Sequence, residues 1–333
     1  MSLEACLPPS LRGPATQITS ISDGLSGAGV YRVEADGQAF VLKIPPEQET
    51  SDHWHRVLEI RRQAAAAGIT PAVVHVDEAR RAVLTAMVAD RSFSAFYRDP
   101  VSHAHALAQL GETLRRLHAL PLPADDQGTD AADAPWTQFP TSWGTLTTAG
   151  IAVPDFVRRA AEELLTEVAP ESGRAPVLSH NDVHPKNLVH DGARLYLMDW
   201  DAAGPNEPFY DLATIAVFLG MDGPTCRRLL SAYETAAIDA PPASSLEVPP
   251  VPKRFLYDRR LIAALCGTGF LQFGFRSGYT ADADASGGQT LESTPALGEF
   301  YQKMRAGTLS LATGEGRWAF GLALVRESVT ALA

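Results

Sequence analysis

The chain has 333 residues, of which 45% are hydrophobic, so it can bury a sizeable core in one large or two ordinary domains. Lysine and arginine total 28 against 39 aspartates and glutamates, and the formal charge of -11 argues against a nucleic-acid partner held by phosphate contacts. The three cysteines, Cys6, Cys226 and Cys266, are far apart, odd in number and in no C-x-x-C arrangement, so they suggest neither a disulfide framework nor a zinc site and predict reduced core thiols.

The first ninety residues predict a small, mostly antiparallel sheet that carries one helix. Residues 30–44, VYRVEADGQAFVLKI, alternate β-prone and polar residues around Asp36-Gly37, a pair suited to a two-residue hairpin turn. Residues 52–67 have a helical pattern that ends at Gly68 and is followed by Pro71. The segments AVVHVD and AVLTAMV then predict two more short strands.

Beyond residue 90 the pattern is mainly helical. In HALAQLGETLRRLHAL the leucines recur every three or four residues, which predicts a helix facing the core. Residues 121–150 are rich in Ala, Asp, Pro and Gly and predict a long loop or insert, although Trp136 and Trp143 indicate that parts of it pack. Residues 154–168 predict a second amphipathic helix. A short strand, RLYLMDWD, precedes a buried helix that begins at DLATIAVFLG. The run APPASSLEVPPVPK predicts a connector, and the remainder, apart from DADASGGQ, is helical in pattern.

The stretch LSHNDVHPKNLV crowds polar side chains between apolar flanks, which indicates either a surface turn or a catalytic loop. His180, Asp182 and Asn187 are followed by a hairpin and then by Asp199, in the spacing H-x-D-x-x-x-x-N followed by D-x-D. Transfer of a γ-phosphoryl group requires a base that orients the acceptor hydroxyl and Mg²⁺ bound by hard oxygen ligands. We therefore predict that Asp182 is the base and that Asn187 and Asp199 are Mg²⁺ ligands.

The N-terminal part supplies candidates for nucleotide binding. The glycine-containing turn GLSGAGV can lay backbone N–H groups over phosphates, which makes Ser26, Gly27 and Gly29 candidate contacts. Lys43 lies within the apolar strand FVLKI, a place suited either to a snorkelling side chain or to a phosphate ligand. We expect its carboxylate partner to come from the following helix, where Glu59 is the candidate.

These elements together resemble the aminoglycoside phosphotransferase and choline kinase superfamily, which shares its fold with protein kinases. The matching stretches are HNDVHPKN, LYLMDWD and AGPNEPFYDLA, and with VLKI and GITPAVV the resemblance extends over about residues 18–235. The element GPNEPFYDLA favours the branch of choline, ethanolamine and thiamine kinases. The C-terminal third, which selects the acceptor in this family, contains no matching motif.

The resemblance implies an α+β, bilobal, protein-kinase-like fold. Residues 1–90 would form the nucleotide-binding lobe, and residues 91–333 a mainly helical lobe with the catalytic loop (178–201) and the acceptor-binding C-terminal helices. ATP would bind in the cleft with its adenine against the connector at 86–89, where Met87 is the candidate contact. The implied reaction is ATP- and Mg²⁺-dependent O-phosphorylation of a small hydroxyl compound.

The acceptor is expected to be cationic, such as choline, ethanolamine or thiamine. This expectation depends on the net charge and on Asp282, Asp284 and Glu292, which form either an acceptor site or a solvated loop. The alternatives are an aminoglycoside-type antibiotic phosphotransferase and a pseudokinase-like binding module. A protein kinase is disfavoured because the DFG and APE motifs are missing after Asp199.

Other polar residues of the loop have more modest expected roles. His180 and His184 are read as braces of the loop, and Asp201 as a metal ligand, an acceptor ligand or a cap. Asp211 is read as an N-terminal helix cap that also braces the loop. The N-terminus has no signal-peptide pattern and no stretch reaches the ~20 apolar residues of a membrane span, so we expect a cytoplasmic protein without a membrane partner.

Overall fold

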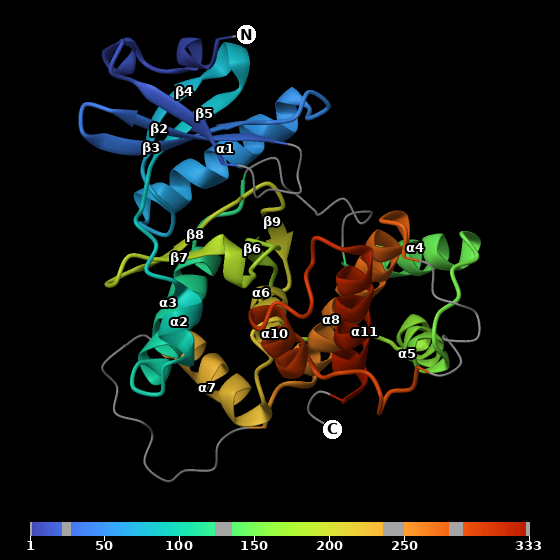
Figure 1. Ribbon diagram of the computed structural model, residues 1–333. Coiled ribbons are helices and arrows are strands. Elements are labelled where there is room, and N and C mark those ends of the chain that lie inside the picture. Colours follow the sequence, from blue (N-terminus) through green and yellow to red (C-terminus); the bar gives the residue numbers. More distant parts are fainter. Residues whose placement is uncertain (1, 22–27, 124–134, 236–249, 280–288, 331–333) are drawn as a thin grey trace.

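The first part of the chain folds into an antiparallel five-stranded sheet with the strand order β1-β2-β3-β5-β4 (Figure 1). The computed structural model describes residues 2–21, 28–123, 135–235, 250–279 and 289–330. The strands are β1 (Gln17–Ser20), β2 (Gly29–Ala35), β3 (Gln38–Ile44), β4 (Val73–Asp77) and β5 (Ala82–Ala86). Short 3-10 turns occur at Leu3–Cys6, Pro9–Leu11 and Glu78–Arg80.

The predicted hairpin is confirmed in its register. Ala35 pairs with Gln38, and the two residues between them, Asp36 and Gly37, have φ angles of 52° and 73°. Two positive φ values in succession are typical of the two-residue turn that matches the twist of antiparallel strands. The same register places Lys43 in a central strand, between Val30 of β2 and Val83 of β5.

Helix α1 (Ser51–Ala66) connects the sheet to the rest of the molecule. The side chain of Thr50 accepts a hydrogen bond from the N–H of His53 and so caps the first turn. Trp54 and Leu58 pack against Val83 of the sheet. Ile60, with other residues of the helix, belongs to the large core of the helical part. Because one helix contributes to both cores, its position fixes how the sheet lies over the catalytic loop.

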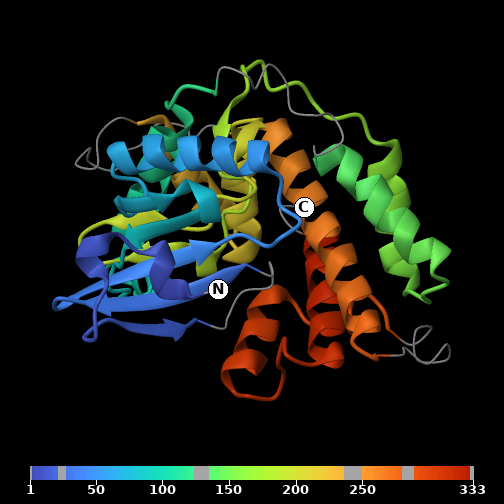
Figure 2. The same ribbon diagram turned by 90° about the horizontal axis from the view of Figure 1, so that it is seen from above.

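The second part is mainly helical, with two small strand pairs that carry the predicted catalytic segment. Strand β6 pairs with β9, and β7 pairs with β8, both antiparallel. In Figures 1 and 2, α4 and α5 lie beyond α8, on the side away from α3. The elements are α2 (Phe93–Arg98), α3 (His103–His118), α4 (Pro135–Thr148), α5 (Asp155–Thr166), β6 (Val177–Ser179), a 3-10 turn (Pro185–Asn187), β7 (Leu188–His190), β8 (Leu195–Leu197), β9 (Gly204–Asn206), α6 (Phe209–Phe218), α7 (Gly223–Glu234), α8 (Lys253–Arg276), α10 (Leu297–Arg305) and α11 (Gly314–Thr330).

One expectation about the helical part is wrong in part: the packing expected at Trp143 is confirmed, but the segment around it is a helix and not a loop. The tract expected as a loop or insert contains α4, whose Phe139, Trp143 and Leu146 are buried at helical spacing. They belong to one hydrophobic cluster with Leu261 of α8, so tertiary packing stabilises a segment whose composition suggests a loop. The proline-rich connector lies largely, and the DADASGGQ loop almost wholly, outside the described residues.

Helices α8 and α11 approach each other closely along the C-terminal part. A Cβ atom on Gly267 of α8 would lie 2.7 Å from Val325 of α11, and one on Gly321 would lie 2.8 Å from the carbonyl oxygen of Gly267. Glycine therefore permits this packing because any side chain would force the helices apart. Within the described ranges no helix is both long and apolar enough to span a membrane.

Candidate active site

The segment after β6 is held in place by a buried carboxylate. Asp211, in the first turn of α6, accepts hydrogen bonds from the backbone N–H groups of His180 and Asn181, each at 2.8 Å. His118 of α3 lies 3.1 Å from the same carboxylate. Burial raises the pKa of Asp211, but the hydrogen bond and charge of His118, together with the charge and backbone N–H of His180, lower it, and the net pKa is below its usual value. Asp211 is thus a charged brace of the loop, as predicted, although the N-cap position of α6 belongs to Pro208.

His180 also has a bracing role. Its Nε2 lies 2.9 Å from the carbonyl oxygen of Met198, to which it donates a hydrogen bond, and its ring packs against Trp200 with centroids 4.8 Å apart. Burial lowers the pKa of His180, which favours the neutral ring. The Trp200 indole in turn donates to the hydroxyl of Thr70, which follows α1. The loop is therefore tied both to α6 and to the segment that leads to β4.

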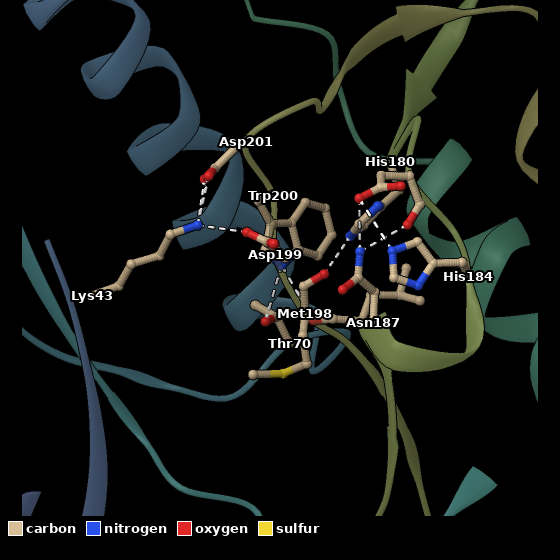
Figure 3. Close-up of polar contacts among 11 residues, drawn as sticks. Lys43, Thr70, His180, His184, Asn187, Met198, Asp199, Trp200 and Asp201 are labelled. Atoms are coloured by element: carbon tan, nitrogen blue, oxygen red, sulfur yellow. Dashed lines mark hydrogen bonds and ion pairs between the residues drawn. The ribbon is translucent and has the colours of Figure 1, made fainter. Parts of the chain in front are cut away.

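Asp182 and Asn187 form a direct pair. The Asn187 side-chain amide donates to Asp182 Oδ2 at 2.9 Å and to the Asp182 carbonyl oxygen at 3.0 Å (Figure 3 shows Asn187 beside His184). His184 Nε2 lies 3.5 Å from the same Oδ2. The Asp182 side chain is 44% exposed, so this carboxylate is oriented but still accessible. With the amide nitrogen turned to Asp182, the Asn187 side-chain oxygen faces away from it.

Lys43 of β3 reaches across to the segment that follows β8. Its Nζ lies 2.5 Å from Asp199 Oδ1 and 2.7 Å from both carboxylate oxygens of Asp201 (Figure 3). Burial raises the pKa of Asp199, but Lys43 lowers it by its charge and hydrogen bond, and the net pKa is below its usual value. Asp199 has φ 63°, a left-handed conformation that is uncommon outside glycine. The turn therefore presents both carboxylates to one lysine.

The residues present fit Mg²⁺. The backbone N–H of Met198 donates to the Asn187 carbonyl oxygen at 2.9 Å, which joins the strand before Asp199 to the loop. Asn187 and Asp199 thus contribute a neutral and a charged hard oxygen, and Mg²⁺ commonly takes its remaining ligands from phosphate and water. In the described part of the chain, no cluster of three or more His, Cys, Asp or Glu side chains is suited to hold a metal by itself.

The expected ion pair between Lys43 and Glu59 is not formed. Glu59 is exposed on α1 and accepts a hydrogen bond from Gln63 at 3.2 Å, whereas both ion pairs of Lys43 in the described structure are with aspartates. The cause is the phase of the helix. Trp54 and Leu58 turn towards the sheet, and Glu59 therefore points elsewhere.

The other predicted nucleotide contacts have different positions. Ser26 and Gly27 lie outside the described residues. Gly29 begins β2 opposite Ile44, close to Lys43 in the same sheet. Met87 directly follows β5, and its backbone N–H donates to the Ala39 carbonyl oxygen at 3.0 Å. Gly29 and Met87 thus both lie at the margin of the sheet that carries Lys43.

Two residues that were not predicted lie beside Lys43. Arg61 of α1 and Glu49, shortly before this helix, line a cavity of about 20 Å³ together with Lys43 and Asp201. Burial and the charge of Asp201 raise the pKa of Glu49. The sequence contains a signal for Arg61, since it continues the stripe of Trp54, Val57 and Leu58 at intervals of three and four residues.

Side chains of α6 and α8 lie within range of the Asp182 charge. The charge of Asp182 adds to burial in raising the pKa of Cys266 to about 12, and it also acts on Tyr210, whose pKa burial raises well above its usual value. These side chains therefore lie within electrostatic range of the predicted base. Of the acidic trio expected near the acceptor, Asp282 and Asp284 lie outside the described residues and Glu292 is exposed.

Comparison with solved structures identifies the fold. A choline/ethanolamine kinase family protein from Mesorhizobium loti is 20% identical, with a TM-score of 0.57 over 97% of this chain and 96% of that chain. A spectinomycin phosphotransferase solved with ADP and spectinomycin is 13% identical, with a TM-score of 0.56 over 94% and 93% of the two chains. These similarities show the kinase-like α+β fold that the sequence predicts.

Comparison at the level of sequence identifies the family. A stretch of 36 residues is 44% identical to the protein LicA of Haemophilus influenzae, and it spans 11% of this chain and 14% of LicA. The profile of the phosphotransferase enzyme family, APH, matches residues 17–247, which include Lys43 and the whole of the catalytic segment. The chain described above therefore belongs to the APH phosphotransferase enzyme family.

Proposed function

We propose that the protein is an ATP- and Mg²⁺-dependent O-phosphotransferase that acts on a hydroxyl group of a small cationic molecule, such as choline, ethanolamine or thiamine. The family supports phosphoryl transfer in general. One observation supports it most at this site: Lys43 Nζ, from the sheet, lies 2.5 Å from Asp199, which follows the catalytic loop. A cation suited to phosphate and a carboxylate suited to Mg²⁺ thereby face the same space.

In this proposal Asp182 is the general base. The acceptor hydroxyl oxygen forms a bond to the γ-phosphorus while the bond from that phosphorus to the bridging oxygen of ATP breaks and ADP leaves. Asp182 takes the hydroxyl proton, late in a step that depends mainly on positioning and charge compensation. The hydrogen bond from Asn187 holds one carboxylate oxygen of Asp182, which leaves the other available to the acceptor.

Asn187 and Asp199 would hold Mg²⁺ in this proposal. When bound there, Mg²⁺ offsets negative charge on the phosphates. Lys43 would contact the phosphates, with the bound nucleotide near Gly29 and its adenine near Met87. To reach the phosphates the lysine must give up contacts with its two aspartates, each of which is now within 2.7 Å.

A cationic acceptor is supported by the acidic balance of the chain, whose formal charge is -11. The Asp182 carboxylate is 44% exposed, and a carboxylate is a favourable neighbour of an ammonium group. The similar solved structures include a choline/ethanolamine kinase family protein, but also a spectinomycin phosphotransferase, so an antibiotic acceptor is the alternative.

A panel of acceptors tests the proposal. The purified protein is incubated with ATP, Mg²⁺ and, separately, choline, ethanolamine, thiamine, aminoglycosides, spectinomycin and neutral sugars, and ADP formation and the phosphorylated product are measured. We expect acceptor-dependent turnover with a cationic amino alcohol or thiamine. Turnover with the antibiotics alone would favour the alternative. Nucleotide binding without turnover on any acceptor would favour a binding module.

A further inference from the structure

Arg61 is a buried cation in the interior of the proposed nucleotide cleft. Its residue exposure is 8%, and it is carried by α1, the helix that packs against both the sheet and the helical part. It lines the cavity of about 20 Å³ with Lys43, Glu49 and Asp201. Arg61 therefore shares one small cavity with Lys43 and with the carboxylates of Glu49 and Asp201.

Within the described structure the Arg61 guanidinium makes no hydrogen bond, and no carboxylate oxygen lies within 4.0 Å of it. Its interactions with Asp201, Asp199 and Glu49 act at longer range: they raise its pKa, whereas burial lowers it more strongly. An arginine remains charged in proteins, and a buried charge without a partner is costly. Arg61 thus has no direct partner in the described structure, although two carboxylates line the same cavity.

Lys43 is the direct partner of both aspartates in this structure. It lies 2.5 Å from Asp199 and 2.7 Å from Asp201, so one cation compensates two carboxylates. If Lys43 engages nucleotide phosphates and Asp199 engages Mg²⁺, Asp201 loses the cation that now compensates it. Glu49 makes a replacement cation for Asp201 more necessary, since the pKa of Glu49 is itself raised by burial and by the charge of Asp201.

We propose that Arg61 is a positioning residue that takes over the Asp201 carboxylate when Lys43 turns to the phosphates of the bound nucleotide. This inference rests on the proposed function, because it requires a nucleotide that competes for Lys43. The planar guanidinium suits the exchange, since its parallel N–H groups can bind both oxygens of one carboxylate. In this proposal helix α1 contributes a cation that pairs with Asp201, whereas the sequence led us to expect a carboxylate that pairs with Lys43.

Two other roles for Arg61 would change ligand binding in a different way when the side chain is removed. If the guanidinium bound a phosphate group directly, its removal would weaken nucleotide binding whether or not Asp201 carried a charge. If Arg61 only held α1 in place, its removal would weaken the binding of every ligand of the cleft. A proposal of partner exchange instead predicts that the effect depends on the Asp201 charge and on the phosphates of the ligand.

The test is a double-mutant cycle on equilibrium binding. The dissociation constants of Mg²⁺–ATP and of adenosine, which has no phosphates, are measured calorimetrically for six proteins: wild type, R61Q, R61K, D201N, the double variant R61Q/D201N, and R62Q. Arg62 is a matched control because it is half exposed on the same helix and lies 3.9 Å from Glu78 at the surface. Denaturant unfolding without ligand reports whether each variant is folded.

We expect R61Q to weaken Mg²⁺–ATP binding about tenfold in the wild-type background and to have little effect in the D201N background, since contacting groups couple. Adenosine binding should be unchanged by R61Q, and R62Q should behave as wild type. R61K should restore binding in part, because a lysine supplies the charge without the planar pair of donors.

An equal effect of R61Q in both backgrounds, or no effect in either, would overturn the inference while leaving the proposed function intact. An equal loss of adenosine and Mg²⁺–ATP binding would overturn it in favour of a purely structural role. Failure of the folded wild-type protein to bind Mg²⁺–ATP at all would overturn the proposed function itself, and the inference with it.

Discussion

Lys43 and Asp201 form an ion pair of 2.7 Å although they lie 158 residues apart in the chain. The pair joins a central strand of the sheet to the turn after β8, and Asp199 shares the same lysine. The most buried member of this group is Lys43, with a side-chain exposure of 17%. In the proposed function, a bound nucleotide must therefore rearrange the contact that joins the sheet to the turn after β8.

Removing the lysine should weaken nucleotide binding much more than removing Glu59. We expect Lys43→Met to raise the Kd for Mg²⁺–ATP about 10- to 100-fold, as for the loss of a hydrogen bond to a charged group. Glu59→Gln should leave this Kd unchanged, because Glu59 is exposed and bonds Gln63 on its own helix. Titration calorimetry on both variants measures the difference. A large increase of this Kd in Glu59→Gln would instead indicate that Glu59 pairs with Lys43 when the nucleotide binds.

Asp199 should determine the requirement for Mg²⁺. In Asp199→Asn one charged oxygen ligand becomes neutral, so the Mg²⁺ concentration that gives half-maximal turnover should rise by about tenfold or more. Asp191→Asn is the control, since this carboxylate accepts hydrogen bonds from Ala193 and Arg194 in the nearby β7–β8 turn and does not face the site. An unchanged Mg²⁺ titration for Asp199→Asn would contradict its assignment as a ligand.

The buried carboxylate of Asp211 should make a large and pH-dependent contribution to stability. Asp211→Asn should lower the free energy of unfolding at neutral pH by about 3 kcal/mol, because it breaks a buried, charged hydrogen-bond network. The pKa of Asp211 is lowered in the folded protein, so the contribution is fully present above the unfolded-state pKa of about 3.9 and is lost as pH falls through the folded pKa.

Denaturant unfolding of wild type and variant from pH 7 to pH 3 checks this dependence. The difference between the two proteins should shrink below about pH 4. Asp222→Asn, at the N-cap of α7, is the comparison at an exposed site and should cost about 1 kcal/mol or less. A constant difference for Asp211→Asn across this pH range would show that its charge contributes nothing.

The expected cationic acceptor can be tested by local neutralisation of charge. Net charge acts weakly beyond about 8 Å at physiological salt, whereas carboxylates next to a bound cation act strongly. Neutralising the loop set should therefore raise the KM of the acceptor and leave ATP kinetics unchanged, and neutralising an exposed control set should change neither. Equal KM values for both variants would show that the loop is only solvated. The loop set is Asp282, Asp284 and Glu292, and the control set is Glu162, Glu163 and Glu171.

Glu167 is unsuitable for that control set. It forms an ion pair of 2.8 Å with Arg260 of α8, so its removal would also disturb the packing of α5 on α8. The three control residues chosen above are exposed in the described structure.

The features that the sequence predicts correctly depend on local spacing. The hairpin follows from a pair of turn residues between alternating strands, and Asp182 and Asn187 are brought together because only four residues of one loop separate them. Helix α4 could not be predicted in this way. Its Phe139 and Trp143 are stabilised by a cluster that includes residues of α8, more than a hundred residues later in the chain, and its composition is that of a loop.

The partner of Lys43 could likewise not be predicted from local spacing. A motif fixes the lysine on its strand, but the phase of α1 decides which side chain of the helix faces it. That phase follows from the apolar stripe that begins at Trp54 and leads to Arg61, two positions beyond Glu59. The pairing with Asp201 depends on how the sheet is placed over the helical part, which no local pattern specifies.

The proposed role of Asp182 as the general base can be tested by a paired measurement of nucleotide binding and turnover. For wild type and Asp182→Asn, the Kd of Mg²⁺–ATP and the kcat with the best acceptor of the panel are determined under the same conditions. We expect an unchanged Kd and a kcat lower by about 10² to 10⁴, the usual range for a positioned general base. A kcat close to that of wild type, with ATP still bound, would contradict the account.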